Sequence, residues 1–501
     1  MKELGSKTCL AVLLVVGAAI SACAQDTHVA FNVEQLDAQI EAHLTQPKFS
    51  AALWGIKIVS LDTGKIIFEH HADRLMSPAS NSKLYTGALG LNRLGGDYRL
   101  STRVFAAGKI SRSGTLHGDL IIVGQGDPSW NERRLGTNFW TAFEPFVTLL
   151  NRAGVRRIDG GLIADATFFR GEPMGASWTI DDLRDGEAGL ISALTLDDNV
   201  AQVLVEPGVE AGARCKLTLL QPATSLIFSN QTVTAPPGSP ARLELFRPLD
   251  GKAVFILGQL AAGNAGQTLD VVVPDPAGWF AAALKLALAR HGIKVSGLAR
   301  GVAWPQSGPG IPPTAHGPGW KINGAVSLGT VYSPPLREVV RDFMKPSQNL
   351  EADLLLADVG EIMRGSNAPA WQTSHEAGIA ALNDFLAAAG VTPGDVCFDE
   401  GSGLSRNNLT TANATIALLE YMAKQREADD FIGSLPVAGV DGTLRRRFRN
   451  TAAAGNVRAK TGTLRWAQAL SGYVTTAAGE QLAFSIMLNR FAPAPGDSGQ
   501  A

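Results

Sequence analysis

Three short polar motifs, spread widely along the chain, constrain the fold more than any other feature of this sequence. In chain order they are Ser80-Asn81-Ser82-Lys83, Ser347-Gln348-Asn349 and Lys460-Thr461-Gly462. Each motif is weak evidence alone, but their order and wide separation describe one active site that is assembled from distant segments. The fold must therefore bring three remote parts of the chain into a single cleft.

The first motif has the spacing of an activated nucleophile. A serine hydroxyl is a weak nucleophile until a neighbouring group removes its proton. Lys83 follows Ser80 by three residues, so a helix would place both side chains on one face. Burial near a second cation such as Lys460 would lower the pKa of Lys83 and allow it to act as a base. Taken alone, the motif also fits a helix cap with a solvated lysine, because roughly one or two chance S-x-x-K matches are expected in a chain of this length.

The other two motifs offer a proton relay and an edge that binds a carboxylate. Ser347 supplies a second hydroxyl and Asn349 an amide, although a turn between two helices would use the same residues. On an edge strand, Lys460 and Thr461 would hold a carboxylate, and Gly462 would let a substrate backbone approach without a Cβ in the way. A surface strand with an exposed lysine is the alternative for this motif. The ordered set of three favours a serine active site over coincidence.

The N-terminus predicts export from the cytoplasm. Basic residues precede an apolar run over residues 9–20, which is too short to remain across a bilayer, and small residues follow it. Two outcomes fit this pattern. Residues 1–24 can be a signal peptide that is cleaved at Ala22-Cys23-Ala24, or Cys23 can carry a lipid anchor, because residues 20–23 resemble a bacterial lipoprotein box. Both outcomes place the mature chain outside the cytoplasm, and no later apolar run is long enough for a membrane span.

Composition describes an ordinary globular protein and excludes several classes. A chain of 501 residues is too long for one core and predicts about three domains of about 150 residues. The net charge of −2 gives no basic surface that would bind nucleic acid. The His and Cys residues lack metal-ligand spacing, so neither a metal nor another cofactor is expected. Cys215 and Cys397 could pair in an oxidising compartment. Because they lie in segments assigned to different domains, free buried thiols are the expectation.

Hydrophobic periodicity outlines the elements that carry the motifs. Residues 51–60 and 65–69 predict a β-hairpin, and residues 456–463, 468–474 and 482–488 predict three antiparallel strands that pair with it. Predicted helices run from about Ser80 to the Gly95-Gly96 pair, and over residues 139–153, 279–291, 336–344 and 350–359. Residues 99–274 contain none of the motifs and are therefore interpreted as an insertion.

With these motifs in place, the chain resembles the class C low-molecular-mass penicillin-binding proteins, the D-alanyl-D-alanine carboxypeptidase/endopeptidase family (peptidase family S13). The resemblance covers nearly all of the mature chain. Besides the three motifs it rests on residues 78–86, 118–120, 126–129, 197–199, 333–336, 401–406 and 435–444. The last of these segments is especially specific. Gln348 departs from the family pattern, which often has Asp at that position.

The resemblance implies an α+β fold. We expect a serine β-lactamase/DD-peptidase-like transpeptidase domain, an antiparallel sheet flanked by helices, with two inserted smaller domains. The expected boundaries are residues 25–98 and 275–501 for the two parts of the penicillin-binding catalytic domain, and 99–274 for inserted domains II and III. The implied activity is that of a periplasmic, serine-type D-Ala-D-Ala carboxypeptidase or endopeptidase. Its partners would be peptidoglycan stem peptides and the β-lactam antibiotics that acylate it.

The resemblance also assigns site residues. Catalysis would use Ser80 as the acylated nucleophile, with proton transfer and binding by Lys83, Ser347, Asn349 and Lys460. The backbone N–H groups of Ser80 and Thr463 would form the oxyanion hole. The substrate would contact Thr461, Gly462, Arg406 and Asp165. Two other functions stay open: a β-lactamase or esterase of the same fold, for which no water-activating group is evident, and a non-catalytic wall-binding module, against which the intact motifs argue.

Overall fold

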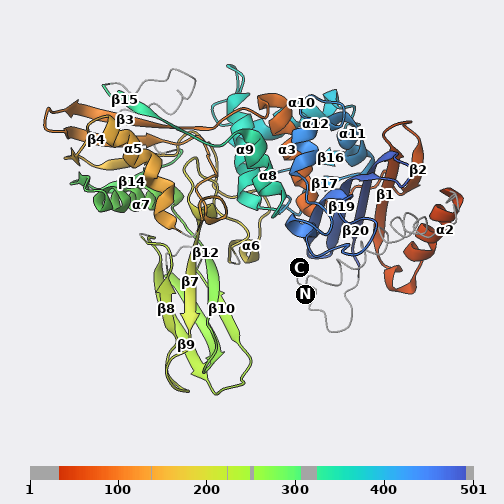
Figure 1. Cartoon of the computed structure of the whole chain (residues 1–501), viewed down its shortest axis with the longest axis horizontal. Coiled ribbons are helices and arrows are strands. Elements are labelled where there is room, and N and C mark those ends of the chain that lie inside the picture. Colours follow the sequence, from red (N-terminus) through yellow and green to blue (C-terminus); the bar gives the residue numbers. More distant parts are fainter. Residues whose placement is uncertain are drawn as a thin grey trace.

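The computed structural model describes residues 33–136, 138–184, 186–222, 224–248, 253–305 and 324–491. The predicted signal peptide and Cys23 lie outside these residues. The described chain forms a motif-bearing unit, which holds all three motifs, and a large insertion that extends away from it (Figure 1). No helix of the described residues is both long enough and apolar enough to cross a bilayer.

A five-stranded antiparallel sheet lies at the centre of the motif-bearing unit, with the order β18-β19-β20-β1-β2. Its strands are β1 (Leu53–Ser60), β2 (Ile66–His70), β18 (Arg458–Leu464), β19 (Ala467–Thr475) and β20 (Gln481–Asn489). β20 pairs with the full length of β1, so that Leu53 lies opposite Asn489 and Ser60 opposite Leu482. The predicted hairpin, the three C-terminal strands and the pairing of these distant segments are therefore confirmed.

Two hydrophobic cores lie on opposite faces of this sheet, because alternate strand residues point to opposite sides. Ile56 and Ile58 of β1 belong to one core, which α2 (Val33–Leu44) covers, while Val59 belongs to the other. That second core is formed by α3 (Ser82–Leu94), α8 (Leu336–Met344), α9 (Asn349–Ile362), α10 (Ser374–Ala388), α11 (Ala412–Met422) and α12 (Ala428–Ser434). In Figure 1 the sheet lies between α2 and the helices α3 and α9.

The predicted helices of this unit match the structure closely. The expected range 336–344 is that of α8, and α3 ends at Gly95, whose φ of 83° only glycine adopts readily. A short 3-10 turn, η3 (Ala79–Asn81), leads into α3, and a second one, η6 (Gly442–Leu444), precedes β18. The small strands β16 (Val396–Cys397) and β17 (Leu409–Thr410) pair at the surface.

The insertion has an upper lobe built on a seven-stranded mixed sheet. Its strands are β3 (Ser101–Ile110), β4 (Thr115–Val123), β5 (Arg157–Ile158), β6 (Leu162–Asp165), β13 (Lys294–Val295), β14 (Ala299–Val302) and β15 (Val326–Tyr332). Its helices are α4 (Glu132–Leu135), α5 (Glu144–Arg152) and α7 (Pro276–Arg290). The helices predicted over 139–153 and 279–291 correspond to a 3-10 turn (Phe139–Phe143) continued by α5, and to α7.

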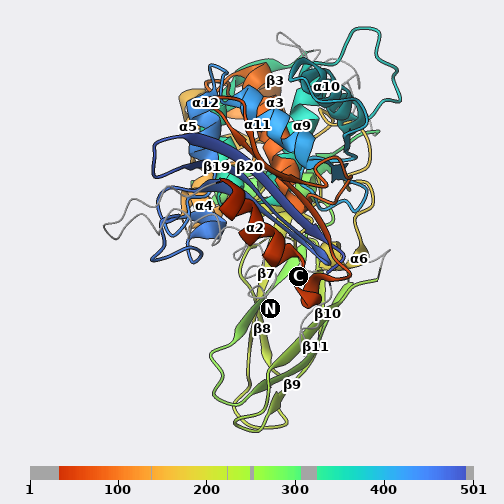
Figure 2. The ribbon, with the colours of Figure 1, turned by 90° about the vertical axis from the view of Figure 1, so that its right-hand side faces the viewer.

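The lower lobe of the insertion projects from the molecule in both views (Figures 1 and 2). It contains two three-stranded sheets, with the orders β12-β7-β8 and β10-β11-β9. The strands are β7 (Val200–Glu206), β8 (Lys216–Leu219), β9 (Ile227–Ala235), β10 (Arg242–Phe246), β11 (Ala253–Ala261) and β12 (Gln267–Val272). The short helix α6 (Ile180–Arg184) precedes this lobe.

The pairing of β15 bears on the extent of the insertion. Tyr332 of β15 lies opposite Ser101 of β3, so the expected boundary at residue 274 would cut through a hydrogen-bonded sheet. The chain leaves and rejoins the motif-bearing unit at adjacent points, because Ser333 N donates to Leu100 O (2.9 Å) and Leu100 N donates to Ser333 Oγ (2.9 Å). We therefore propose that the insertion runs from residue 99 to about residue 333.

The two described cysteines are both free, but only one is buried. Cys215 lies in the core of the insertion, as expected. The expectation that Cys397 is also buried is wrong. Cys397 belongs to β16, a two-residue strand at the surface, so its side chain is exposed.

Candidate active site

Lys83 joins the first motif to the second. Its Nζ donates to Ser80 Oγ (2.9 Å), to Asn349 Oδ1 (2.6 Å) and to the carbonyl oxygen of Ser402 (2.6 Å). Ser80 lies in η3, directly before α3, so Lys83 follows on the first turn of the helix. The backbone approaches this turn under strain, since Ala79 has a φ of 48°, a region that L-residues with a Cβ rarely adopt. The predicted juxtaposition of Ser80, Lys83 and Asn349 is present.

Burial controls the protonation of Lys83. Its side chain is fully buried, and this desolvation lowers the pKa of Lys83 to about 8, although the charges of Glu400, Asp353 and Glu187 raise it in part. A lysine with such a pKa has a substantial neutral fraction near physiological pH. It can therefore accept a proton from a hydroxyl at 2.9 Å.

A buried acidic residue that belongs to none of the three motifs acts electrostatically on Lys83. Glu400 is completely buried and accepts hydrogen bonds from Gly403 N (2.7 Å), Asn408 Nδ2 (2.8 Å) and the hydroxyl of Ser402. These bonds fix the loop whose Ser402 carbonyl receives Lys83. In the sequence, Glu400 directly precedes the 401–406 segment, which is the one feature that could have pointed to it. A single acidic residue forms no motif, so its role could not be predicted from residue spacing.

Lys460 joins the second motif to the third. Its Nζ donates to Ser347 Oγ (2.7 Å) and to the carbonyl oxygen of Thr461 (2.7 Å). Burial lowers the pKa of Lys460 well below its usual value, and the charge of Lys83 lowers it further. That electrostatic coupling means that the two lysines share one site. All three motifs therefore meet, as the sequence predicts.

The second motif occupies a strained turn between α8 and α9. Ser347 has a φ of 72°, a left-handed conformation that costs energy for a serine and is typical of functional sites. The preceding Lys345 anchors this turn to the 435–444 segment, since its Nζ contacts both carboxylate oxygens of Asp441 (2.8 and 3.0 Å) and the carbonyl oxygen of Leu435 (2.6 Å). The same segment supplies Thr443, whose hydroxyl accepts a hydrogen bond from Thr461 Oγ1 (2.8 Å).

Gly462 lets the edge strand lie against the serine segment. A Cβ at this position would lie 2.3 Å from the carbonyl oxygen of Pro78, a distance no side chain tolerates. β18 therefore packs directly on the turn that presents Ser80. Thr463, the next residue, is exposed, and its hydroxyl donates to Gln468 Oε1 (3.1 Å) on β19.

Arg406 and Asp165 lie in different environments. Arg406 is part-exposed and bridges to α6 of the insertion, because its Nη1 donates to Asp182 Oδ2 (2.9 Å). Asp165 is fully buried at the end of β6, where its Oδ1 accepts hydrogen bonds from the backbone N–H (2.9 Å) and hydroxyl (2.6 Å) of Thr167. Among the described contacts, neither residue joins the hydrogen-bond network of the three motifs. Within the same residues, no group of three or more His, Cys, Asp or Glu side chains is placed to hold a metal ion.

The chain matches a known protein family over most of its length. The sequence model of the D-Ala-D-Ala carboxypeptidase 3 (S13) family matches residues 36–500. The chain belongs to this family. An S13 relative named D-alanyl-D-alanine carboxypeptidase, from Actinomadura sp. (strain R39), is 33% identical over 473 residues, which cover 92% of this chain and 82% of the relative.

A second relative of this family provides a solved structure. D-alanyl-D-alanine carboxypeptidase DacB of Haemophilus influenzae is 26% identical over 451 residues, covering 89% of this chain and 88% of that protein. The crystal structure of penicillin binding protein 4 (dacB) from Haemophilus influenzae matches with a TM-score of 0.75 at 25% identity, over 90% of this chain and 93% of that one. The S13 relationship and the α+β fold that the sequence predicts are thus confirmed.

Proposed function

We propose that this S13 enzyme is a serine-type D-Ala-D-Ala carboxypeptidase in which Ser80 is the nucleophile and Lys83 its base. The observation that carries the proposal is the position of Lys83, whose buried Nζ lies 2.9 Å from Ser80 Oγ and is oriented by Asn349 and Ser402. The lowered pKa of Lys83 supports the same role. The names of the two relatives, both D-alanyl-D-alanine carboxypeptidases, supply the substrate class.

The proposed reaction has two steps. Neutral Lys83 takes the Ser80 proton as Oγ attacks the carbonyl carbon of the penultimate D-Ala, and the backbone N–H groups of Ser80 and Thr463 stabilise the oxyanion. Ser347, bonded to Lys460, passes a proton to the departing amine and is reprotonated from the pair of lysines, so that D-Ala leaves, Lys83 is neutral again and an acyl-enzyme remains. Water then attacks the ester, Lys83 takes its proton and returns it to Ser80 Oγ as the ester bond breaks, and the shortened peptide leaves with a free carboxylate.

Substrate binding is proposed for the remaining predicted residues. Lys460 and Thr461 would hold the terminal carboxylate of the peptide, while Gly462 gives its backbone room on β18. Arg406 and Asp165 would contact the side chain of the stem peptide. Arg406 lies where α6 meets the motif-bearing unit, which is consistent with a cleft that the insertion helps to shape.

Penicillin labelling tests this function directly. A β-lactam presents a cyclic amide to Ser80 and should leave a long-lived acyl-enzyme that intact-mass spectrometry detects as a single adduct. Ser80→Ala should carry no adduct, and exposed Ser113→Ala should label like the parent. Absence of an adduct on the parent enzyme would overturn the proposal, and fast turnover of penicillin without accumulation would favour a β-lactamase instead.

We also propose that the enzyme works in the periplasm after export through residues 1–24. The names of its relatives indicate D-Ala-D-Ala as the substrate. These termini belong to the stem peptides of peptidoglycan, a polymer that lies outside the cytoplasmic membrane. The mature N-terminus distinguishes the two export outcomes. Intact-mass measurement should give either a chain that begins at Gln25, or a heavier, diacyl-modified chain that begins at Cys23.

A further inference from the structure

Two acidic side chains are buried near Lys83, on different segments of the chain. Asp353 lies on α9, one turn after Asn349, and Glu400 lies in the loop between β16 and β17. Asp353, Glu400 and Lys83 are all completely inaccessible to solvent. Residues four apart on a helix share a face, so the helix that binds Lys83 through the Asn349 amide also brings a carboxyl group to the same site.

The Glu400 carboxyl group is surrounded by hydrogen-bond donors. Its Oε1 accepts from Gly403 N (2.7 Å), Asn408 Nδ2 (2.8 Å) and Ser405 N (3.4 Å), and its Oε2 accepts from Ser402 N (3.0 Å) and from the Ser402 hydroxyl. Donors that converge on both oxygens stabilise a negative charge. These hydrogen bonds therefore offset the cost of burying Glu400 as an anion.

Asp353 has a much poorer set of donors. Its Oδ1 accepts a hydrogen bond from Gly401 N (2.8 Å), whereas its Oδ2 is buried without a hydrogen-bond partner among the described residues. A charged oxygen in such a place costs far more than a neutral one. Burial raises the pKa of Asp353 well above its usual value, and the charge of Glu400 acts in the same direction, against smaller effects of hydrogen bonds and of Lys83.

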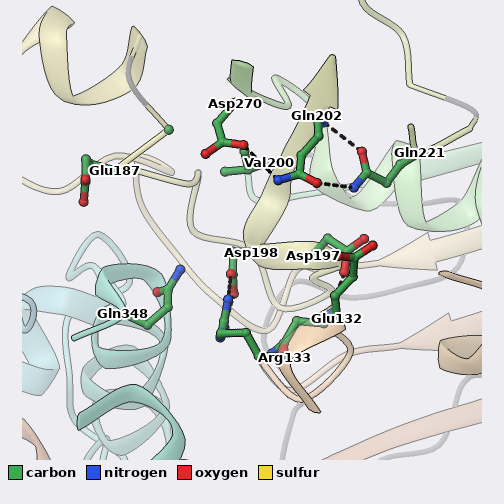
Figure 3. Close-up of a pocket in the computed structure, with 12 residues that line it drawn as sticks. Glu132, Arg133, Glu187, Asp197, Asp198, Val200, Gln202, Gln221, Asp270 and Gln348 are labelled. Carbon is green, nitrogen blue, oxygen red and sulfur yellow. Dashed lines mark hydrogen bonds and ion pairs between the residues drawn. The ribbon is translucent and has the colours of Figure 1, made fainter. Parts of the chain in front are cut away.

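Three other ionisable groups face this cluster from other elements. On α10, burial lowers the pKa of His375 to about 4, although Glu400 raises it in part, so this imidazole is neutral near neutral pH. On β18, burial lowers the pKa of Lys460 well below its usual value. Glu187, after α6, is exposed to a polar cavity of about 350 Å³ (Figure 3), and its charge raises the pKa of Lys83 less than that of Glu400 does.

We propose that Asp353 and Glu400 are positioning residues that carry a single negative charge between them, with a proton on Asp353 and the charge on Glu400. The inference rests on the proposed function, because both acids would act through Lys83 as the base. Two anions beside Lys83 would keep it protonated and inactive. With no anion, the ammonium that forms when Lys83 takes the Ser80 proton would lack a buried counter-charge. One charge satisfies both needs.

The test measures how the rate of Ser80 acylation by penicillin depends on pH. Glu400→Gln removes the anion, so the midpoint of the rate should fall by about one pH unit or more. Asp353→Asn replaces a neutral acid with a neutral amide of similar shape and should not move the midpoint, whereas loss of an ionised Asp353 would lower it. Exposed Glu210→Gln, after β7, and exposed Asp384→Asn, on α10, are the matched controls and should not move it either.

Infrared spectroscopy tests the proton on Asp353 independently of kinetics. A protonated carboxyl group has a C=O stretch that is well separated from the bands of carboxylates. The difference spectrum between the parent and Asp353→Asn near neutral pH should therefore contain a protonated carboxyl band. Loss of a carboxylate band instead, a lowered midpoint in Asp353→Asn, or failure of this variant to fold would overturn the inference.

The remaining outcomes concern Glu400 and the proposed function. A midpoint that does not fall in Glu400→Gln would overturn the role of Glu400, and Glu400→Asp, which keeps the charge, should lie closer to the parent than Glu400→Gln does. If Glu400→Gln does not fold, both readouts of Asp353→Asn still decide where the proton lies. Penicillin labelling of the parent is read separately: without an adduct on Ser80 the proposed function fails, whereas labelling with a contrary infrared result refutes only the charge sharing.

Discussion

Two buried lysines within one hydrogen-bond network define the chemistry at the level of single residues. Burial lowers the pKa of both Lys83 and Lys460, and the charge of Lys83 lowers the pKa of Lys460 further. The three acceptors of Lys83 and the two of Lys460 hold the amines in place whichever of them carries a proton. Protons can therefore pass between the lysines and the neighbouring hydroxyls with little movement of the side chains.

The rate of Ser80 acylation should rise with pH. Lys83 can act as a base only when it is neutral, and a lysine is mostly neutral above its pKa. The second-order rate constant for acylation by penicillin should therefore increase with pH, with a midpoint at about pH 8. Stopped-flow or quenched labelling between pH 6 and 10 measures this limb. A rate that is flat over this range would show that Lys83 does not titrate as the base.

Lys83→Arg should abolish the rise of the acylation rate with pH. A guanidinium stays protonated at all accessible pH values and cannot accept the Ser80 proton. We expect the acylation rate to fall by at least about 100-fold, the lower end of a general-base contribution. Lys65→Arg, at an exposed position between β1 and β2, is the matched control and should label normally. Activity within tenfold of the parent enzyme would remove Lys83 from the mechanism.

At the level of elements, the site depends on how two loops are held together. The Lys345–Asp441 ion pair fastens the 435–444 segment to the strained turn of Ser347, and Thr443 of that segment binds Thr461. The backbone adds a further tie, because Thr443 N donates to Lys345 O (3.0 Å). Motifs two and three are thus aligned by contacts that touch neither Ser80 nor Lys83.

Asp441→Asn should therefore reduce activity more than stability. Losing the charge loosens the alignment of Ser347 with Lys460, and small misplacements of reacting groups are costly, so kcat/KM should fall about tenfold. The ion pair is partly exposed, which limits the change in free energy of unfolding to below about 1 kcal/mol. Glu244→Gln breaks an exposed pair in the lower lobe and should change neither quantity. Unchanged kinetics in Asp441→Asn would contradict the positioning role.

The local sequence pattern predicted most helices and strands but not the contacts between residues far apart in the chain. The amphipathic period of residues 336–344 predicted α8 to the residue, and the apolar run over residues 482–488 predicted β20, because both features depend on neighbours in the chain. The three motifs likewise predicted which groups meet. Glu400 and Glu187 escaped prediction, since single carboxylates have no spacing and act only through tertiary placement. The boundary near residue 333 that we propose could not be inferred from local pattern, because all the other described elements of the insertion lie between β3 and its partner β15 in the chain.

At the level of the whole molecule, two buried acids lie where the insertion meets the motif-bearing unit. Asp127 follows β4 and Asp358 lies on α9, and both are essentially inaccessible to solvent. Burial raises the pKa of Asp127 to about 6, although hydrogen bonds from Ser129 and the charge of Arg134 oppose the shift. Burial also raises the pKa of Asp358 well above its usual value, and the charges of Asp127 and Glu361 act in the same direction. Neither oxygen of Asp358 has a hydrogen-bond partner among the described residues. This junction is therefore most stable when Asp358 is protonated.

The stability of the junction should decrease with pH. A carboxyl group with a raised pKa binds its proton more tightly in the folded chain, so its contribution is complete below the unfolded pKa and is lost as pH rises through the folded value. Asp358→Asn removes this titration. Between pH 5 and 8, the free energy of unfolding of Asp358→Asn in urea should rise relative to that of the parent by more than about 1 kcal/mol. Exposed Asp384→Asn on α10 is the control, and parallel curves for Asp358→Asn and the parent would disprove the effect.

The pairing of β20 with β1 sets the order in which this enzyme can mature. During synthesis the segment that bears Ser80 emerges more than 350 residues before Lys460, and β1 gains its partner strand only when β20 has been made. A nascent chain thus carries Ser80 long before it carries Lys460, and the proposed site stays incomplete until β18 has been synthesised. Premature termination anywhere upstream of β18 would yield a product with no latent hydrolytic activity.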